Sequence, residues 1–158
     1  MGDSCHHTHH DGPPDAGTVR LALDEVDRRL SDQGERMTAA RTRVLELLLS
    51  AGEPVKAYDL IARFGTDGAP AKPPTVYRSL EFLEKQGLVH RIASISAYFA
   101  CTSGTDAHAA AFLICDCCGA TQEVSATLAD GLDAAASSKG YVIERTTIEA
   151  HGRCPACA

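Results

Sequence analysis

The sequence predicts an α+β protein of two small domains, an N-terminal winged helix-turn-helix and a C-terminal α/β unit with a structural zinc site. Three observations indicate this class. Four segments with helical spacing of apolar residues precede two short strand-like segments, the pattern then changes to strands around one helix, and two Cys-x-x-Cys pairs fall in this last part. In a chain of 158 residues two such domains each have a thin core, so a metal ion or a dimer partner must add stability.

The start of the chain is expected to be a disordered, His-rich tail. Residues 1–17 show no apolar periodicity and contain Cys5 together with four histidines. A flexible tail has to lose chain entropy before it can hold a metal ion, so a functionally silent tail is favoured over a loose transition-metal site. The first domain is predicted to span residues 18–101.

Four helices are predicted in this domain, delimited by cap and breaker residues. Thr18 and Thr38 are typical N-cap residues, and a glycine ends three of the four helices. In the fourth helix Pro74 lies in the first turn, where its missing N–H leaves no hydrogen bond unmade. The predicted helices run from Thr18 to Gly34, from Thr38 to Gly52, from Lys56 to Phe64 and from Pro74 to Gly87.

Two strands are predicted after the helices, from Leu88 to Ile92 and from Ala97 to Cys101. Helices followed by a two-stranded ribbon are typical of a winged helix, a helix-turn-helix variant that binds DNA. A connector over residues 102–110 leads to a second domain over residues 111–158. In the second domain we expect strands Ala111–Cys115, Thr121–Val124 and Tyr141–Glu149, and a helix over roughly Ala126–Lys139.

Cysteine spacing predicts the structural zinc site. Two cysteines separated by two residues can face one metal ion from a single tight turn, and two such pairs complete a tetrahedral site. Disulfides or separate core thiols are the alternatives. The sequence shows no signal peptide and no run of 18 apolar residues, so we expect a cytoplasmic protein with no membrane contact and with reduced thiols. The predicted ligands are Cys115, Cys118, Cys154 and Cys157.

Charge is distributed unevenly along the chain. The net charge is −6, but residues 36–91 contain nine Lys/Arg and six Asp/Glu, a balance of +3 that leaves −9 for the remainder. A basic middle section within an acidic chain is compatible with contacts to DNA phosphates. A solvated face of mixed charge has the same composition, so charge alone does not decide between the two.

One face of the predicted helix from Pro74 to Gly87 is suited to DNA. Val76, Leu80 and Leu83 share one side of the helix at about 100° per residue, and Arg78 lies nearly opposite. Arginine can pair with guanine through two hydrogen bonds, and hydroxyl groups near a helix N-terminus can hold phosphate. An ordinary amphipathic helix with a solvated polar side is the alternative. The predicted DNA-binding residues are Tyr58, Thr75, Tyr77 and Arg78.

Five stretches of the chain resemble the ferric uptake regulator family of metal-sensing repressors, and most closely its zinc uptake regulator branch. The run Pro-Pro-Thr-Val-Tyr-Arg and the final Glu-Ala-His-Gly-x-Cys-x-x-Cys are specific to it, and the match extends from about residue 20 to the end of the sequence. The matching stretches are Ala57–Leu60, Lys72–Leu80, Gly87–His90, Phe112–Gly119 and Ile148–Cys154.

This resemblance implies a zinc-responsive repressor that binds palindromic operator DNA as a zinc-loaded homodimer and represses zinc uptake genes. It implies a winged helix, a C-terminal dimerisation domain and two zinc ions per chain, one structural and held by four thiolates, the other regulatory and held at the domain junction. Imidazole, thiolate and carboxylate ligands together suit zinc better than magnesium or calcium. The regulatory ligands that the resemblance implies are His90, Cys101, His108 and Glu123.

Several alternatives remain open at this point. The connector is one residue shorter than expected for the branch, so Asp106 competes with His108 as a ligand; Cys117 fits no ligand position. His151 is either a hydrogen-bond donor to a ligand or purely structural. A thiol-based redox or peroxide sensor of the same family and a zinc-buffering protein are rival functions. The zinc-enzyme motifs His-x-Glu with Pro-Cys-x-x-Cys and His-Glu-x-x-His do not occur, so we expect no enzyme.

Overall fold

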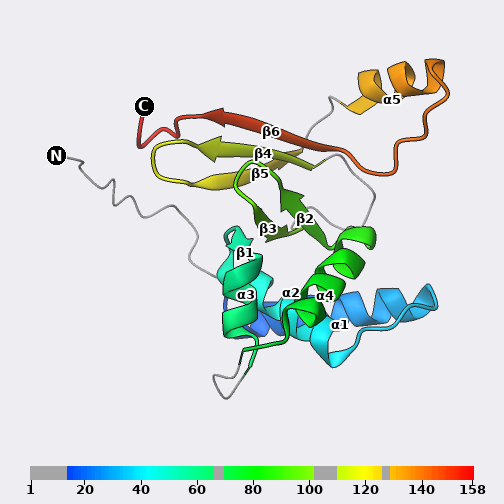
Figure 1. Cartoon of the computed structure of the whole chain (residues 1–158), viewed down its shortest axis with the longest axis vertical. Helices are drawn as coiled ribbons and strands as arrows, with labels where there is room; N and C mark the ends of the chain where they lie inside the picture. Colours follow the sequence, from blue (N-terminus) through cyan, green and yellow to red (C-terminus); the bar gives the residue numbers. More distant parts are fainter. Residues whose placement is uncertain (1–13, 66–69, 102–109, 126–128) are drawn as a thin grey trace. The chain divides into compact units, whose positions relative to one another are not determined.

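The computed structural model describes residues 14–65, 70–101, 110–125 and 129–158. The described residues up to Cys101 form one compact unit, and those from Ala110 onward form a second (Figure 1). The expected tail falls almost entirely outside the described residues, as does most of the connector. No helix among the described ranges is long and apolar enough to cross a membrane.

Four helices build the first unit, and their apolar faces form its core. Because the buried leucines and valines recur every three or four residues, each helix presents one apolar stripe to the others. The helices are α1 (Ala16–Asp32), α2 (Ala39–Ala51), α3 (Ala57–Arg63) and α4 (Pro73–Lys85). The largest fully buried side chains of this core are Leu30, Leu45, Leu48, Leu60, Leu80 and Leu83.

The start of α1 corrects the prediction that Thr18 is its N-cap. The helix begins at Ala16, and Asp15 is the N-cap residue. The Asp15 carboxylate accepts hydrogen bonds from the N–H groups of Gly17 and Thr18 at 2.8 and 3.1 Å. An aspartate satisfies two otherwise unpaired amides here, while Thr18 Oγ1 donates to the same carboxylate at 2.6 Å. The predicted tail boundary at residue 17 is therefore placed two residues too far along the chain.

The other helix ends follow the predicted cap residues closely. Thr38 caps α2 by accepting from the Arg41 N–H at 3.3 Å, and α2 ends at Gly52, whose φ of 63° is in the left-handed region. Helix α4 starts at Pro73, one residue before the predicted Pro74, and both prolines occupy its first turn.

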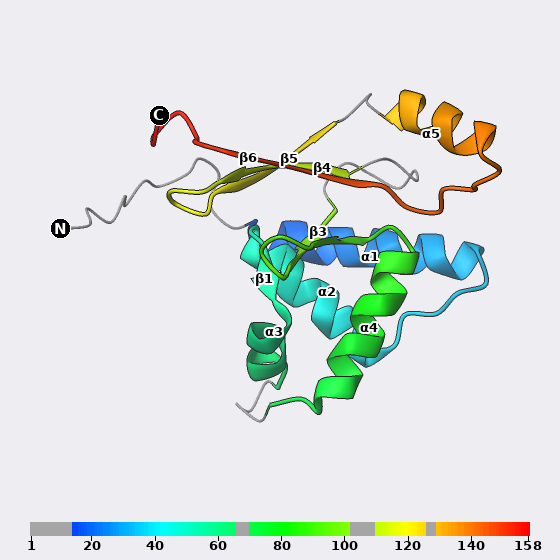
Figure 2. The same ribbon diagram turned by 45° about the horizontal axis from the view of Figure 1, so that its top comes forward.

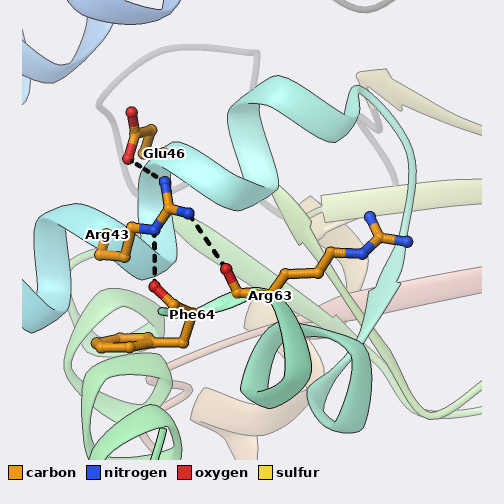
Figure 3. Close-up of polar contacts among 4 residues, drawn as sticks. All are labelled: Arg43, Glu46, Arg63 and Phe64. Atoms are coloured by element: carbon orange, nitrogen blue, oxygen red, sulfur yellow. Dashed lines mark hydrogen bonds and ion pairs between the residues drawn. The ribbon is translucent and has the colours of Figure 1, made fainter. Parts of the chain in front are cut away.

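Arg43 joins α2 to the C-terminal end of α3 (Figure 3). Its guanidinium donates to the carbonyl oxygens of Phe64 at 3.0 Å and Arg63 at 3.2 Å, and it pairs with Glu46 at 2.8 Å. Carbonyls at the end of a helix have no partner within the helix, so Arg43 supplies two of them with a donor. This contact fixes the position of α3 relative to α2.

A three-stranded sheet completes the first unit. Strands β2 (Val89–Ile92) and β3 (Ala97–Ala100) form the predicted hairpin, and β1 (Val55–Lys56) adds to β3 in the order β1-β3-β2. Strand β1 is not among the predicted strands, because two residues are too few to show a periodic pattern. Figures 1 and 2 both show this sheet on one side of the four helices.

The second unit is a three-stranded sheet with one helix. The sheet order is β5-β4-β6, with β5 antiparallel and β6 parallel to β4. Its elements are β4 (Ala110–Cys115), β5 (Thr121–Ser125), α5 (Ala129–Ser138) and β6 (Thr147–Gly152). In both views α5 lies beyond the end of this sheet and does not cover its face (Figures 1 and 2).

The last strand corrects the prediction of a strand over Tyr141–Glu149. Residues 141–146 are not in a strand, and β6 continues to Gly152. The position of β6 is set by its parallel partner, because Thr147 pairs with Ala110 at the beginning of β4 and Gly152 pairs with Cys115 at its end. The apolar residues before Thr147 remain outside the ladder, and Tyr141 and Val142 are exposed.

Candidate metal centres and DNA-binding face

The four cysteines of the two Cys-x-x-Cys pairs lie together at one end of the second sheet. Cys115 ends β4, and Cys154 follows the end of β6 by two residues. Since β4 and β6 are adjacent parallel strands, their carboxyl ends meet at the same edge. The Asp116 N–H donates to the Gly152 carbonyl at 2.9 Å, which extends the pairing into the two turns.

The distances within this cluster suit a tetrahedral zinc ion. The four sulfur atoms all lie within 4.8 Å of one another, and Cys118 Sγ lies 3.7 Å from Cys154 Sγ. A tetrahedral zinc with Zn–S bonds of about 2.3 Å separates its sulfur atoms by about 3.8 Å. The cysteines among the described residues are free thiols, so the structure has no disulfide between the two pairs.

The electrostatic environment of the cluster also suits a cation. The N–H groups of Cys118 and Cys154 lower the pKa of Cys115 to about 6, because both hydrogen bonds stabilise the thiolate. The Cys154 N–H lies 3.3 Å from the Cys115 sulfur. Burial and the neighbouring Cys154 thiol raise the pKa of Cys157. Without a metal ion, Cys115 thus favours the thiolate form and Cys157 favours the thiol form. A divalent cation among the four sulfurs would stabilise the thiolate form of all four.

His151 and Asp116 form a second link between the two cysteine turns. His151 Nδ1 lies 2.9 Å from Asp116 Oδ1, in the turn that contains Cys115 and Cys118. His151 is on β6, so the pair connects the strand before Cys154 to the turn after β4. Cys117 is exposed and stands outside the group of four sulfurs.

Two of the predicted regulatory ligands are brought together on the wing sheet. His90 on β2 pairs with Phe99 on β3, and the Cys101 N–H donates to the Leu88 carbonyl at 2.9 Å. Cys101 is two residues beyond Phe99, so it lies diagonally opposite His90 on the same face of the sheet. The His90 ring nitrogen and Cys101 sulfur that can bind a metal are within 4.8 Å of each other.

The other two predicted regulatory ligands are not part of the first unit. Glu123 is a half-buried residue of β5, where it pairs with Phe112 of β4. His108 and its competitor Asp106 lie outside the described residues.

The predicted DNA-contact residues lie on the outer surfaces of α3 and α4. Val76, Leu80 and Leu83 are buried as predicted, whereas Arg78 is exposed. Tyr77, which precedes Arg78 in α4, is 50% exposed. Tyr58, at the start of α3, is 79% exposed. Both aromatic side chains are therefore accessible to a binding partner.

Thr75 and Arg78 also line a surface hollow of about 220 Å³. Its other lining residues are Thr38, Ala40 and Arg41 from the N-terminal end of α2, and Ser79 from α4. From the sequence, Thr38 is predicted only to be a helix cap, and Arg41 is one of the nine positive charges of residues 36–91. Nothing in a linear pattern indicates that residues 34 or more positions apart line one hollow.

Comparison with known proteins identifies the family of this chain. Residues 32–151 match the profile of the ferric uptake regulator family, which is more than half of the sequence. The chain belongs to the ferric uptake regulator family. The resemblance inferred from the motifs is thereby confirmed.

Members of the family that regulate zinc uptake are among the similar proteins. The zinc uptake regulation protein of Escherichia coli (strain K12) is 36% identical over 142 residues, which cover 89% of this chain and 83% of that protein. The ferric uptake regulation protein of Synechococcus elongatus is 29% identical over 133 residues, with coverage of 81% and 89%.

Solved structures of the family show the same fold. A zinc uptake regulator complexed with zinc and DNA is 35% identical, has a TM-score of 0.79, and is matched over 88% of this chain and 94% of its own. Holo XcZur is 37% identical with a TM-score of 0.73, and the match covers 85% and 95% of the two chains. These likenesses bear out the predicted α+β class with a winged helix.

Proposed function

We propose that this protein is a zinc-responsive transcriptional repressor, which binds palindromic operator DNA as a zinc-loaded homodimer and represses zinc uptake genes in the cytoplasm. The observation that carries this proposal is the likeness, at a TM-score of 0.79 over 88% of the chain, to a zinc uptake regulator complexed with zinc and DNA. We assign no catalytic role to any residue of the chain.

The structural zinc in this proposal is bound by Cys115, Cys118, Cys154 and Cys157. The 3.7 Å sulfur–sulfur distance and the lowered pKa of Cys115 support this assignment. The four thiolates come from two turns at the same end of the sheet, one after β4 and one after β6, so metal binding joins these turns and adds stability that a small core lacks. Bound zinc here supplies structure, and all four positions are taken by protein ligands.

The regulatory zinc in this proposal is bound by His90, Cys101, His108 and Glu123. The closeness of His90 and Cys101 on the wing sheet supports half of this ligand set. The family resemblance supports the other half. Because the set draws on the wing, the connector and the second domain, it is complete only in one arrangement of the two domains.

A site of this kind turns zinc concentration into DNA affinity. A ligand shifts a conformational equilibrium only through its different affinity for the two states. An arrangement that completes the four-ligand site, and at the same time sets both α4 helices of a dimer one DNA turn apart, is selected when zinc is plentiful. A shift from mostly open to mostly closed needs a preference of about 10⁴-fold, which zinc–thiolate and zinc–imidazole bonds can supply.

The dimer in this proposal forms through the second domain. Helix α5 has no buried residue between Gly131 and Ser138, and Leu132 is 49% exposed. Tyr141 and Val142, which follow α5, are 72% and 89% exposed. A helix of a small domain that leaves its apolar residues uncovered supports burial against a second copy.

DNA recognition in this proposal rests on Tyr58, Thr75, Tyr77 and Arg78. Three of these side chains are exposed and Thr75 is half-buried, and all four lie in the first half of α3 or α4, which supports the assignment.

One titration tests the proposed function. Free zinc is varied while zinc per chain and binding to a palindromic promoter of a zinc uptake gene are recorded together. We expect DNA binding to appear as the second zinc equivalent binds. DNA binding that is independent of zinc, or that saturates with one zinc ion per chain, would contradict the proposal.

A further inference from the structure

The hollow at the N-terminal ends of α2 and α4 has the chemistry of an anion site. Two guanidinium side chains and two threonine hydroxyls line it, those of Arg41, Arg78, Thr38 and Thr75. The first turns of α2 and α4 contain no acidic residue. The partial positive charge of the two helix N-termini adds to the charge of the arginines. The first two residues of α4 are prolines and offer no N–H group, so α4 contributes through its dipole and side chains.

Arg41 is held in place without using up its hydrogen-bond donors. The guanidinium carbon of Arg41 lies 3.4 Å from the centre of the Phe82 ring, so the side chain stacks on α4. Its Nη1 donates to the backbone carbonyl of Arg36. Guanidinium has five N–H groups, and the Arg41 side chain makes no other hydrogen bond among the described residues. Most of its donors are therefore available to a ligand.

The neighbouring Arg43 shows what an arginine with a structural role looks like in this helix. Arg43 pairs with Glu46 and caps the carbonyls of α3, as Figure 3 shows. By contrast, neither Arg41 nor Arg78 forms an ion pair with a carboxylate in the part of the chain that the structure describes. Glu46 and the α3 carbonyls neutralise and use the donors of Arg43. Arg41 is positioned by Phe82 and by the Arg36 carbonyl, and its charge is left for an external anion to neutralise.

The threonine at the start of α2 adds a directed donor. Thr38 Oγ1 accepts from the Arg41 N–H, so the hydroxyl hydrogen of Thr38 is free to donate to an anion. Ser79, which also lines the hollow, donates its hydroxyl hydrogen to the Thr75 carbonyl at 2.8 Å, so this hydrogen is not available to an anion.

We propose that this hollow binds one phosphodiester of the operator backbone, with Arg41 and Thr38 as the donors from α2 and Thr75 as the donor from α4. The inference rests on the proposed function and adds two residues, Thr38 and Arg41, to the DNA-binding set. The contact carries no sequence information. It sets the depth and register at which α4 presents Arg78 to the base edges.

The test compares Arg41→Ala with wild type on two duplexes, a palindromic promoter of a zinc uptake gene and a random sequence, at several salt concentrations. Both affinities should fall by the same factor, on the order of tenfold, because a charge-assisted phosphate contact is lost. The slope of log Kd against log salt should decrease by about 0.9 for each phosphate released, hence by about 1.8 for two protomers.

Two further variants keep the result interpretable. Arg41→Met retains a side chain on the Phe82 ring but removes the charge, so it should lose the same salt dependence even if Arg41→Ala is unstable. Arg28→Ala removes an exposed charge of α1 that pairs with Glu25, and it should leave the slope unchanged. If Arg41→Met binds both duplexes as tightly as the wild type does, with the same salt slope, this inference alone is overturned. Wild-type protein that binds neither duplex would overturn the proposed function and this inference with it.

Discussion

Replacement of Arg43 by methionine should destabilise the first unit by about 2–3 kcal/mol, because it removes two charged hydrogen bonds to helix-end carbonyls. The Phe64 bond, 3.0 Å long and partly buried, accounts for most of this loss, since a hydrogen bond to a charged group contributes about 1.5–3 kcal/mol. The more exposed bond to Arg63 contributes less. The half-exposed ion pair with Glu46 adds about 0.5 kcal/mol. Methionine keeps the packing of the aliphatic stem, so the change isolates the polar contacts.

The assay is urea unfolding of the zinc-loaded full chain followed by far-UV circular dichroism. The signal reports chiefly on the first unit, because four of the five helices among the described residues lie there. Arg28→Met is the matched control. It also removes an i,i+3 pair with a glutamate, but both side chains are more than 60% exposed, and Arg28 donates to no carbonyl in the ranges that the structure describes. The control should cost less than about 0.5 kcal/mol. Equal losses in Arg28→Met and Arg43→Met would refute the reasoning that the carbonyl contacts carry the stability.

Three further variants separate the metal and DNA roles. Cys154→Ser should abolish the structural zinc and with it the dimer at any zinc concentration; a stable dimer with unchanged zinc content in sedimentation and metal analysis would contradict this. Cys101→Ser should give a folded dimer that no longer binds its operator, and operator affinity equal to wild type at fixed zinc would rule out the sensor assignment. Arg78→Ala should cost about 1–3 kcal/mol of operator binding and relax base preference, whereas an equal loss on all sequences would make Arg78 a phosphate contact.

Local chemistry made much of the fold predictable from the sequence. Thr38, Gly52 and the prolines at the start of α4 act through contacts within a few residues, so their roles are visible in the linear pattern. The cysteine cluster could also be predicted from the sequence. A two-residue spacing fixes which pairs share a turn, and only the meeting of the two turns depends on the tertiary fold.

Features that depend on distant partners were not predictable. The start of β6 at Thr147 is set by its parallel pairing with Ala110, not by the apolar residues around Tyr141. The first N-cap was misplaced because Asp15 and Thr18 are both good caps, and the choice depends on which amides the carboxylate reaches. Arg41 gained its candidate role only through its stacking on Phe82, 41 residues further along the chain.

The central claim is that one exchangeable zinc ion decides whether the dimer binds its operator. The most direct measurement strips this ion with a mild chelator, verifies by metal analysis that one zinc per chain remains, and compares operator affinity with that of the two-zinc form. We expect the one-zinc dimer to bind the operator about 100-fold more weakly, within the usual range of coupling between two sites. Equal affinity of the two forms would contradict it.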